Sequence, residues 1–349
     1  MKITVNASAR YDVTIEKDLL KKIGELCKPI LPDCGKILVV SDSVVAPLYL
    51  KTVRDSFIGA GFNVYSTDFV AGEESKNLDT FSLVLQTAAS LGLCRNDAFV
   101  ALGGGVVGDL TGFAAACYMR GIKFVQIPTT LLAAVDSSVG GKTAVDIPQG
   151  KNLIGAFHQP VAVFFDPNTL KTLPENEWNN GLGEGVKYAI LSGGKTFSLL
   201  ERGLDETTLD EFCSLCVKYK AEIVETDETE RGIRQLLNLG HTVGHAAEKL
   251  SSYKIPHGKA VAYGVKIMAK ASKNAGVLPL SEYEKIINLL KKYDLDFDIP
   301  FSTEQLVAAA ASDKKNRPDG LNAVVIKGIG NCSIEKMSLD KFGEYIKCR

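Results

Sequence analysis

The stretch DAFVALGGGVVGD spans residues 97–109 and decides the expected fold. It begins as an apolar, β-rich run that leads directly into three glycines, and a helix-like segment over residues 110–119 follows. From Gly103 to Gly108 the glycines fit G-x-G-x-x-G, a pattern that lets the backbone approach a pyrophosphate at the N-terminus of a helix. The stretch therefore predicts a strand, a turn and a helix that bind a dinucleotide. A tight turn that serves only close packing is the alternative.

Strands and helices alternate on both sides of this stretch. The first ten residues read as a strand, and further β-rich runs occupy residues 36–40, 62–69, 97–102, 123–127 and 161–165. Such alternation is typical of a parallel, doubly wound sheet. We therefore predict an α/β fold with a Rossmann-like, NAD-binding domain over residues 1–166.

The character of the sequence changes after Asp166. Long amphipathic segments then dominate, at residues 207–225, 242–250, 259–275, 281–293 and 303–312. Their spacing of apolar residues is helical. We predict a mainly α-helical C-terminal domain over residues 167–349 that binds metal and substrate, with the active site in the cleft between the two domains.

The glycine motif differs from the ordinary Rossmann fingerprint in one respect. That fingerprint places an acidic residue about 20 residues after the glycines, where it holds the ribose. Residues 110–135 contain no Asp or Glu, whereas Asp42 lies at the carboxyl end of an earlier predicted strand. We therefore expect a dinucleotide in a different arrangement, with Asp42 as the candidate ribose ligand.

The composition is that of an ordinary globular protein. Among 349 residues, 40 basic and 41 acidic side chains give a net charge of −1, which argues against bulk nucleic-acid binding. No apolar run approaches the roughly 20 residues of a membrane helix, and the N-terminus lacks the apolar core of a signal peptide. We predict a cytoplasmic protein with no nucleic-acid or membrane partner.

The eight cysteines are scattered along the chain, as expected for reduced thiols. Cys213 and Cys216 form a C-x-x-C within a helix-like stretch, where the spacing also places two small residues on one buried face. No second pair accompanies them, so the buried face is a better interpretation than a metal or redox site.

A second glycine-containing segment, DSSVGGKTAVD, covers residues 136–146. Its Gly-Gly-Lys-Thr resembles the end of a P-loop, but the first glycine of that motif falls on Asp136 and the match fails. We interpret the segment as a loop whose polar groups face a ligand. It and the residues just after it offer Asp136, Lys142, Lys151 and Asn152.

Three of the four histidines fall within seventeen positions. His241 and His245 are four residues apart and would share one face of a helix. His257, between Pro256 and Gly258, is expected on a turn that returns to the same place. With Glu184 from a glycine-rich junction, these residues could form a catalytic divalent-metal site; histidines that cap helices or bind backbone carbonyls are the alternative.

Four motifs together resemble the 3-dehydroquinate synthase family of sugar-phosphate cyclases. They are GGGVVGD from Gly103, QIPTT from Gln126, DSSVGGKT from Asp136 and LNLGHTVGHA from Leu237. The resemblance runs over nearly the whole chain and is specific in its combination. It implies NAD and one divalent metal, zinc or cobalt, as cofactors, and a homodimer.

The resemblance also implies a role for each matching residue. The metal ligands would be Glu184, His241 and His257, and His245 would contact substrate, although spacing alone made His245 a ligand as well. The catalytic group would comprise Lys142, Lys187, Lys220, Arg234, Asn238 and His245. Substrate would also be held by Arg120, Asp136, Lys151, Asn152 and one of Lys314 and Lys315. NAD would contact Asp42, Gly72, Glu73, Glu74, Ser75, Lys76, Gly105, Val106, Val107, Gly108, Asp109, Thr129, Thr130, Lys142, Lys151, Thr169, Leu170, Lys171 and Thr172.

The reaction that the resemblance implies is the conversion of a seven-carbon keto-sugar acid phosphate to 3-dehydroquinate, in the shikimate pathway. Transient oxidation by NAD acidifies a neighbouring C–H, phosphate leaves by β-elimination, the hydride returns, and an aldol step closes the ring. Several lysines and arginines suit so anionic a substrate. Alternatives are another sugar-phosphate cyclase, a metal-dependent polyol dehydrogenase and a non-catalytic NAD-sensing protein.

Overall fold

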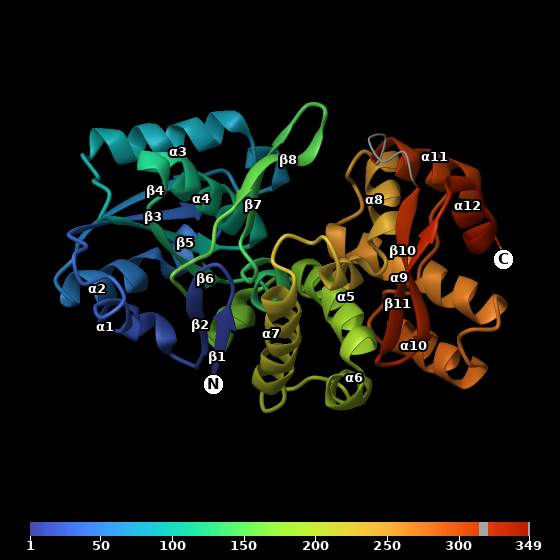
Figure 1. Cartoon of the computed structure of the whole chain (residues 1–349). Coiled ribbons are helices and arrows are strands. Elements are labelled where there is room, and N and C mark those ends of the chain that lie inside the picture. The colour runs from blue at the N-terminus through green and yellow to red at the C-terminus, as the bar shows by residue number, and fades with distance from the viewer. Residues whose placement is uncertain (314–319, 348–349) are drawn as a thin grey trace. The chain divides into compact units, whose positions relative to one another are not determined.

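The computed structural model describes residues 1–313 and 320–347, and the chain forms two compact units (Figure 1). The first unit comprises Met1–Leu173 and Lys220–Glu228, and the second comprises Pro174–Tyr219 and Thr229–Arg349. The break after Leu173 lies close to the boundary expected after residue 166. A short later segment, Lys220–Glu228, nevertheless returns to the first unit.

A seven-stranded sheet forms the centre of the first unit, in the order β1-β2-β9-β6-β5-β3-β4. Only β1 runs antiparallel to its neighbour, β2; the other neighbouring strands are parallel. The expected N-terminal strand is thus two strands, because the chain turns between Asn6 and Arg10. The strands are β1 (Lys2–Asn6), β2 (Arg10–Ile15), β3 (Lys36–Asp42), β4 (Asn63–Phe69), β5 (Ala98–Gly103), β6 (Lys123–Pro128) and β9 (Ala162–Phe165).

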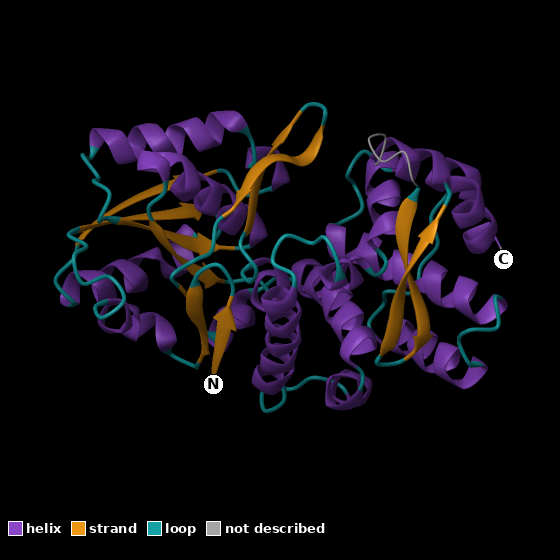
Figure 2. Cartoon of the chain, in the orientation of Figure 1, coloured by secondary structure: helices purple, strands orange, loops and turns teal. Residues whose placement is uncertain are grey.

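Helices cover both faces of this sheet, as Figure 2 shows. Along β3, Ile37 and Val39 belong to a core cluster with residues of α1 and α2, whereas Leu38 and Val40 belong to a cluster with α3 and α4. Alternate residues of a strand point to opposite faces, so a strand buried on both sides is apolar throughout. The helices are α1 (Ile23–Cys27), α2 (Lys51–Gly59), α3 (Leu78–Ser90) and α4 (Gly105–Cys117).

The strand order reverses between β3 and β5. From β3 the chain goes to β4 on one side and then returns to β5 on the other. In open parallel sheets, ligands bind at the carboxyl ends of the strands at this switch point. Asp42 ends β3 and Gly103 ends β5, so the candidate ribose acid and the glycine motif flank the switch point. The predicted doubly wound α/β architecture is confirmed.

A two-stranded hairpin, β7 (Lys142–Ile147) and β8 (Gly150–Phe157), also belongs to the first unit. The prediction of a loop over residues 136–146 was wrong for the part that forms β7. Thr143, Ala144 and Val145 are buried there. Thr143 lies against α4, since a Cβ on Gly112 would come within 2.5 Å of its methyl group. The buried run is only three residues long, and glycines and charges lie at both ends of the segment, so the sequence alone did not indicate a strand.

The second unit is mainly helical and includes one antiparallel hairpin (Figure 2). Helices α5 and α9 are its two longest buried elements described in full, with eleven buried residues each. The elements are α5 (Glu175–Ser192), α6 (Gly194–Arg202), α7 (Leu209–Thr226), η7 (Ile233–Asn238), α8 (His241–Leu250), α9 (His257–Asn274), α10 (Leu280–Lys292), α11 (Thr303–Asp313), β10 (Leu321–Gly328), β11 (Asn331–Met337) and α12 (Leu339–Lys347). Helix α7 continues into the segment that joins the first unit.

The helical segments expected from periodicity are confirmed as α7 to α11, but two local expectations were wrong. Glu184 lies inside the 18-residue helix α5 and not in a glycine-rich junction. His257 begins a helix instead of lying on a turn. Cys213 and Cys216 are fully buried in α7, as the alternative to a redox motif predicted. Within residues 1–313 and 320–347, no helix combines the length and apolar character that crossing a bilayer requires.

Candidate functional site

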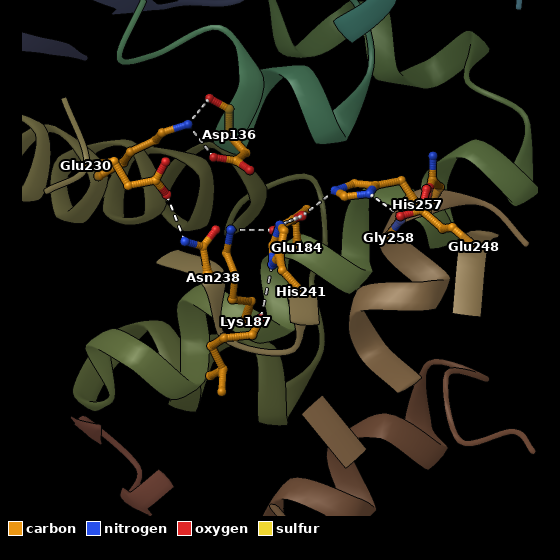
Figure 3. Close-up of polar contacts among 12 residues, drawn as sticks. Asp136, Glu184, Lys187, Glu230, Asn238, His241, Glu248, His257 and Gly258 are labelled. Carbon is orange, nitrogen blue, oxygen red and sulfur yellow. Dashed lines mark hydrogen bonds and ion pairs between the residues drawn. The ribbon is translucent and has the colours of Figure 1, made fainter. Parts of the chain in front are cut away.

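Three histidines of the second unit converge on one point. His241 opens α8, His245 follows one turn later, and His257 opens α9; their candidate ligand nitrogens all lie within 4.8 Å of one another. Glu184 reaches the same point from α5 (Figure 3). Its Oε1 lies 3.4 Å from Nε2 of His241 and 3.2 Å from Nε2 of His257.

Close contact between helices α5 and α9 brings Glu184 and His257 together. A Cβ added to Gly183 would lie 1.9 Å from the carbonyl oxygen of Gly258, so neither backbone leaves room for a side chain at the contact. The side-chain oxygen of Asn180 accepts the Gly258 N–H at 2.6 Å. This bond satisfies one of the N–H groups at the start of α9 that have no acceptor within the helix. The residues next to each glycine are therefore held in fixed relative positions.

Close backbone packing at glycines also holds α8 against α9. A Cβ on Gly264 would lie 1.9 Å from the carbonyl oxygen of Gly240, the residue before His241. One turn later, a Cβ on Gly244 would lie 2.8 Å from the carbonyl oxygen of Ala260. Glycine thus flanks both histidines of α8, and the close backbone packing fixes where their side chains begin.

Charges in this cluster are buried and paired. Lys187 is 1% exposed, and its Nζ lies 2.5 Å from Oε2 of Glu184. Burial lowers the pKa of His241 to about 3, although Glu184 opposes the shift. Burial also acts to lower the pKa of His257, but hydrogen bonds with Glu184 and Glu248 outweigh it and raise this pKa to about 10. The two histidines differ because His257 lies between two carboxylates.

This donor set fits a divalent metal ion. Glu184 is fully buried, and its two carboxylate oxygens have different neighbours: Oε2 contacts Lys187, whereas Oε1 lies beside Nε2 of His241 and Nε2 of His257. Imidazole nitrogens with one carboxylate are the ligands that zinc and similar ions take in catalytic sites, where one position stays open to substrate. Such a site can polarise a bound hydroxyl and stabilise a developing alkoxide.

Polar residues from η7 lie in the same unit. The Asn238 side chain donates to Oε1 of Glu230 at 2.8 Å (Figure 3), and Arg234 is 1% exposed. Glu230 has a left-handed backbone with φ of 60°, a conformation that is uncommon for residues other than glycine. Sequence reasoning missed Glu230, because a single acid beside Arg231 matches no chemical pattern. The pairing directs the Asn238 amide and marks Glu230 as a further candidate.

In the first unit, the ammonium of Lys220 binds both the carbonyl oxygen and the carboxylate of Asp136. The contact with the carbonyl oxygen measures 2.8 Å. Lys220 lies in the part of α7 that belongs to this unit, and Asp136 lies in η5 (Ala133–Ser137). Two residues that are 84 positions apart, both candidates from the resemblance, thus form one partly buried ion pair.

Candidate dinucleotide ligands from three segments also meet in the first unit, together with the candidate substrate ligand Asn152. Nζ of Lys76 lies 2.5 Å from Oδ2 of Asp109 in α4 and 2.6 Å from the side-chain oxygen of Asn152 in β8. Nζ of Lys151 lies 3.4 Å from Glu73 in η3 (Glu73–Ser75). Burial raises the pKa of Asp109, although the Lys76 ammonium opposes this shift. The ion pairs fix η3 and the hairpin against the first turn of α4, which includes Gly105, Val106, Val107 and Gly108.

Other candidates lie near the ends of neighbouring strands. Asp42 accepts the N–H groups of Val44 and Val45 at 2.9 Å, and Thr129 donates its N–H to Gly103 at 3.0 Å. A Cβ on Gly104 would lie 3.0 Å from the methyl group of Thr130. The candidates Thr169, Leu170, Lys171 and Thr172 form η6 (Pro167–Thr172), which follows β9.

Four candidates from the resemblance remain. Arg120 follows the C-terminal end of α4, whose 13 residues carry it about 20 Å from the glycine motif within this chain. Lys314 and Lys315 lie outside the described residues. Lys142 opens β7 with an exposed side chain.

The chain matches two adjacent family models, which together cover residues 66–316. One, described as 3-dehydroquinate synthase N-terminal, covers residues 66–180, and the other, 3-dehydroquinate synthase C-terminal, covers residues 181–316. The 3-dehydroquinate synthase of Clostridium acetobutylicum is 41% identical over 343 residues, which are 97% of this chain and 96% of that protein.

Two solved structures have the same fold as this chain. A 2-deoxy-scyllo-inosose synthase, complexed with carbaglucose-6-phosphate, NAD+ and Co2+, superimposes with a TM-score of 0.89 over 99% of each chain at 26% identity. The 2-epi-5-epi-valiolone synthase of Streptomyces hygroscopicus subsp. jinggangensis, with NAD+ and Zn2+ bound, gives a TM-score of 0.87 over 99% of this chain and 98% of that chain. Its identity is 24%, so the second likeness concerns the fold alone.

Proposed function

Because the chain belongs to the 3-dehydroquinate synthase family, we propose that it converts 3-deoxy-D-arabino-heptulosonate 7-phosphate to 3-dehydroquinate and phosphate. The enzyme is then a phosphate-eliminating carbon–oxygen lyase that uses NAD and one divalent metal. The observation that carries the proposal is the cluster of Glu184, His241 and His257 on three tightly packed helices.

The proposal assigns Glu184, His241 and His257 as metal ligands. A zinc or cobalt ion bound there would lower the pKa of the substrate hydroxyl that is oxidised and stabilise negative charge on its oxygen. Contacts with Glu184 favour this set, since its carboxylate lies within 3.4 Å of both His241 and His257. His245 is then left for substrate and for proton transfer.

The proposal places NAD at the carboxyl ends of β3, β5 and β6. When bound, NAD+ would accept hydride from the substrate and return it later in the same turnover. The N-terminus of α4 offers unpaired N–H groups to the pyrophosphate, and the switch point lies beside it. Asp42, at the end of β3, is the proposed ribose ligand, with the loop residues from Gly72 to Lys76 alongside.

Cationic side chains would hold the anionic substrate. Arg234 and Lys187 are each 1% exposed, and a guanidinium can bind a carboxylate or phosphate through two parallel hydrogen bonds. Asn238, directed by Glu230, would bind a substrate hydroxyl. Lys220, held by Asp136, would place a further positive charge near the phosphate.

Two further parts of the proposal, a homodimer and a phosphorylated sugar acid as the partner, rest on the resemblance. A cytoplasmic location, without nucleic-acid or membrane partners, rests on the charge and the hydropathy of the sequence. The competing activities are another sugar-phosphate cyclase and a polyol dehydrogenase. The 41% identity to a curated 3-dehydroquinate synthase, against 26% to a 2-deoxy-scyllo-inosose synthase, favours the first assignment.

One assay tests the proposal. The purified protein is mixed with NAD, zinc and 3-deoxy-D-arabino-heptulosonate 7-phosphate, and free phosphate and NADH absorbance are followed together. Phosphate release that requires NAD and stops with a chelator, without net NADH, is the expected result. Steady accumulation of NADH would indicate a dehydrogenase, and no signal in either channel would exclude this substrate.

A further inference from the structure

A buried carboxylate that no sequence motif marks lies behind the metal cluster. Glu248 in α8 is 3% exposed, and its Oε2 lies 3.2 Å from Nδ1 of His257 (Figure 3). On the opposite side of the same ring, Nε2 lies 3.2 Å from Oε1 of Glu184. His257 is therefore held between two carboxylates from two different helices.

The two ring nitrogens of His257 then have different bonding roles. A histidine binds a metal ion as the neutral imidazole, which carries one proton, so the nitrogen that donates this proton to a carboxylate leaves the other with a lone pair. Donation from Nδ1 to Glu248 leaves the lone pair of Nε2 directed toward Glu184 and His241. Carboxylate partners of this kind fix the tautomer and orientation of a ligating histidine and make it more basic.

We propose that Glu248 is a positioning residue, which holds the His257 ring in place and thereby sets the affinity of the site for a divalent metal ion. The inference rests on the proposed function, because it takes His257 as a metal ligand. Glu248 itself stays outside the metal shell, since its carboxylate contacts the far nitrogen of the ring.

The surrounding backbone shows why a side-chain contact is needed. Asn180 and the contact between Gly183 and Gly258 fix the start of α9, and with it the Cα of His257. The ring can still turn about its two side-chain torsions. A hydrogen bond to Nδ1 selects one of these orientations, and Glu248 supplies it.

Glu248 is well placed for this purpose because the end of α8 is itself fixed. Its backbone carbonyl accepts the Tyr253 N–H at 2.7 Å and the Ser251 hydroxyl at 2.9 Å. These bonds close the turn between α8 and α9 without using the carboxylate. They also provide a matched control, since Ser251→Ala loosens the same helix end and leaves the carboxylate in place.

The test compares metal binding by four full-length proteins: the wild type, Glu248→Ala, Glu248→Gln and Ser251→Ala. Zinc affinity is measured by competition with a chromophoric chelator, and the visible spectrum of the cobalt-loaded proteins is recorded. We expect Glu248→Ala to bind zinc about 10- to 100-fold more weakly, the usual effect of losing such a partner. Glu248→Gln keeps an acceptor without the charge and should lie between Glu248→Ala and the wild type, whereas Ser251→Ala should bind like the wild type.

The cobalt spectrum separates positioning from a general structural effect. A reoriented His257 changes the ligand field, so the absorption bands of Glu248→Ala should shift, while those of Ser251→Ala should not. Equal zinc affinity and equal spectra in Glu248→Ala and the wild type would overturn the inference. An equal loss of affinity in Ser251→Ala would also overturn it, because the effect would then belong to the helix end.

The wild-type protein distinguishes failure of the inference from failure of the proposed function. If it binds one zinc or cobalt ion per chain and Glu248→Ala does so with unchanged affinity, only the role of Glu248 is wrong. If the wild-type protein binds neither ion, the metal site and the proposed function fail together.

Discussion

Gly183 lies so close to Gly258 that a Cβ at position 183 would be 1.9 Å from the Gly258 carbonyl oxygen. The neighbours of these glycines in the chain are Glu184 and His257, whose side chains approach to 3.2 Å. The distance between Glu184 and His257 therefore depends on how closely the two helices pack at Gly183 and Gly258. A change in the first must disturb the second.

We predict that Gly183→Ala destabilises the protein and weakens metal binding. Alanine favours a helix over glycine by about 1 kcal/mol, but here α5 and α9 must separate, as in an overpacked core. The free energy of unfolding in urea should fall by about 1–3 kcal/mol, and zinc affinity should fall with it. Gly59→Ala in α2 is the control, since its Cβ would meet nothing within 4 Å. Equal stability of the two variants would contradict the packing argument.

The metal content of three alanine variants tests the assignment of the histidines. Glu184→Ala and His257→Ala should be purified without zinc. His245→Ala should keep its zinc and lose activity by about 10²- to 10⁴-fold, the range for a lost acid–base group. Zinc is measured by atomic emission on each purified protein. A metal-free His245→Ala would show that helical spacing identified a ligand and that the carried-over role was wrong.

Arg234 should contribute to transition-state binding through its fork of donors. It is 1% exposed in η7, and hydrogen bonds to charged groups contribute about 1.5–3 kcal/mol each. Arg234→Ala should therefore lower kcat/KM by about 10²-fold or more. Arg234→Lys keeps the charge without the fork and should recover only part of the loss. Near-normal kcat/KM in Arg234→Ala would exclude the role.

Asp97 should make stability depend on pH in the acid range. Its carboxylate accepts the N–H groups of Lys36 and Cys94 at 2.7 Å and of Gly35 at 3.2 Å. Burial acts to raise the pKa of Asp97, but these backbone bonds outweigh burial and the pKa lies below 3.8. The stabilisation is thus complete above the unfolded-state pKa and is lost as the pH falls through the lower, folded-state value.

The corresponding measurement compares Asp97→Asn with the wild type by urea unfolding at several pH values. Asparagine offers one oxygen where the carboxylate offers two, so at pH 7 the free energy of unfolding should fall by about 1–3 kcal/mol. The difference between the two proteins should shrink below pH 3.8. A difference that stays constant down to the acid transition would assign the loss to packing.

The parts of the fold that could be predicted from the sequence are those whose pattern depends on burial alone. Strands β3, β5 and β6 are buried on both faces, so each reads as an apolar run wherever it lies in the sheet. Helix α5 was not recognised, because Gly181, Gly183 and Gly185 lower its helix propensity. The helix forms there because of tertiary packing. The contact with α9 requires glycine at position 183, and this contact cannot be predicted from the local sequence.

The candidate site divides in the same way. The spacing of His241 and His245 places them on one helix face, and the structure brings their rings together with His257. Glu230 and Glu248 were missed, since each acts through a single side chain brought close by tertiary structure. In sequence, a buried acid on a helix, such as Glu248, looks like a solvated one until the neighbouring helix is known.

The return of Lys220–Glu228 to the first unit has a consequence for protein synthesis. Glu225 accepts the backbone N–H of Asn6, the last residue of β1, and Glu228 accepts that of Ser8, in the turn between the first two strands. A ribosome makes these acids long after Leu173, so the nascent first unit must wait for part of α7 before it is complete. A fragment that stops at Leu173 would lack Glu225 and Glu228, which are the partners of that turn. Each unit is therefore encoded by two separate stretches of the messenger RNA.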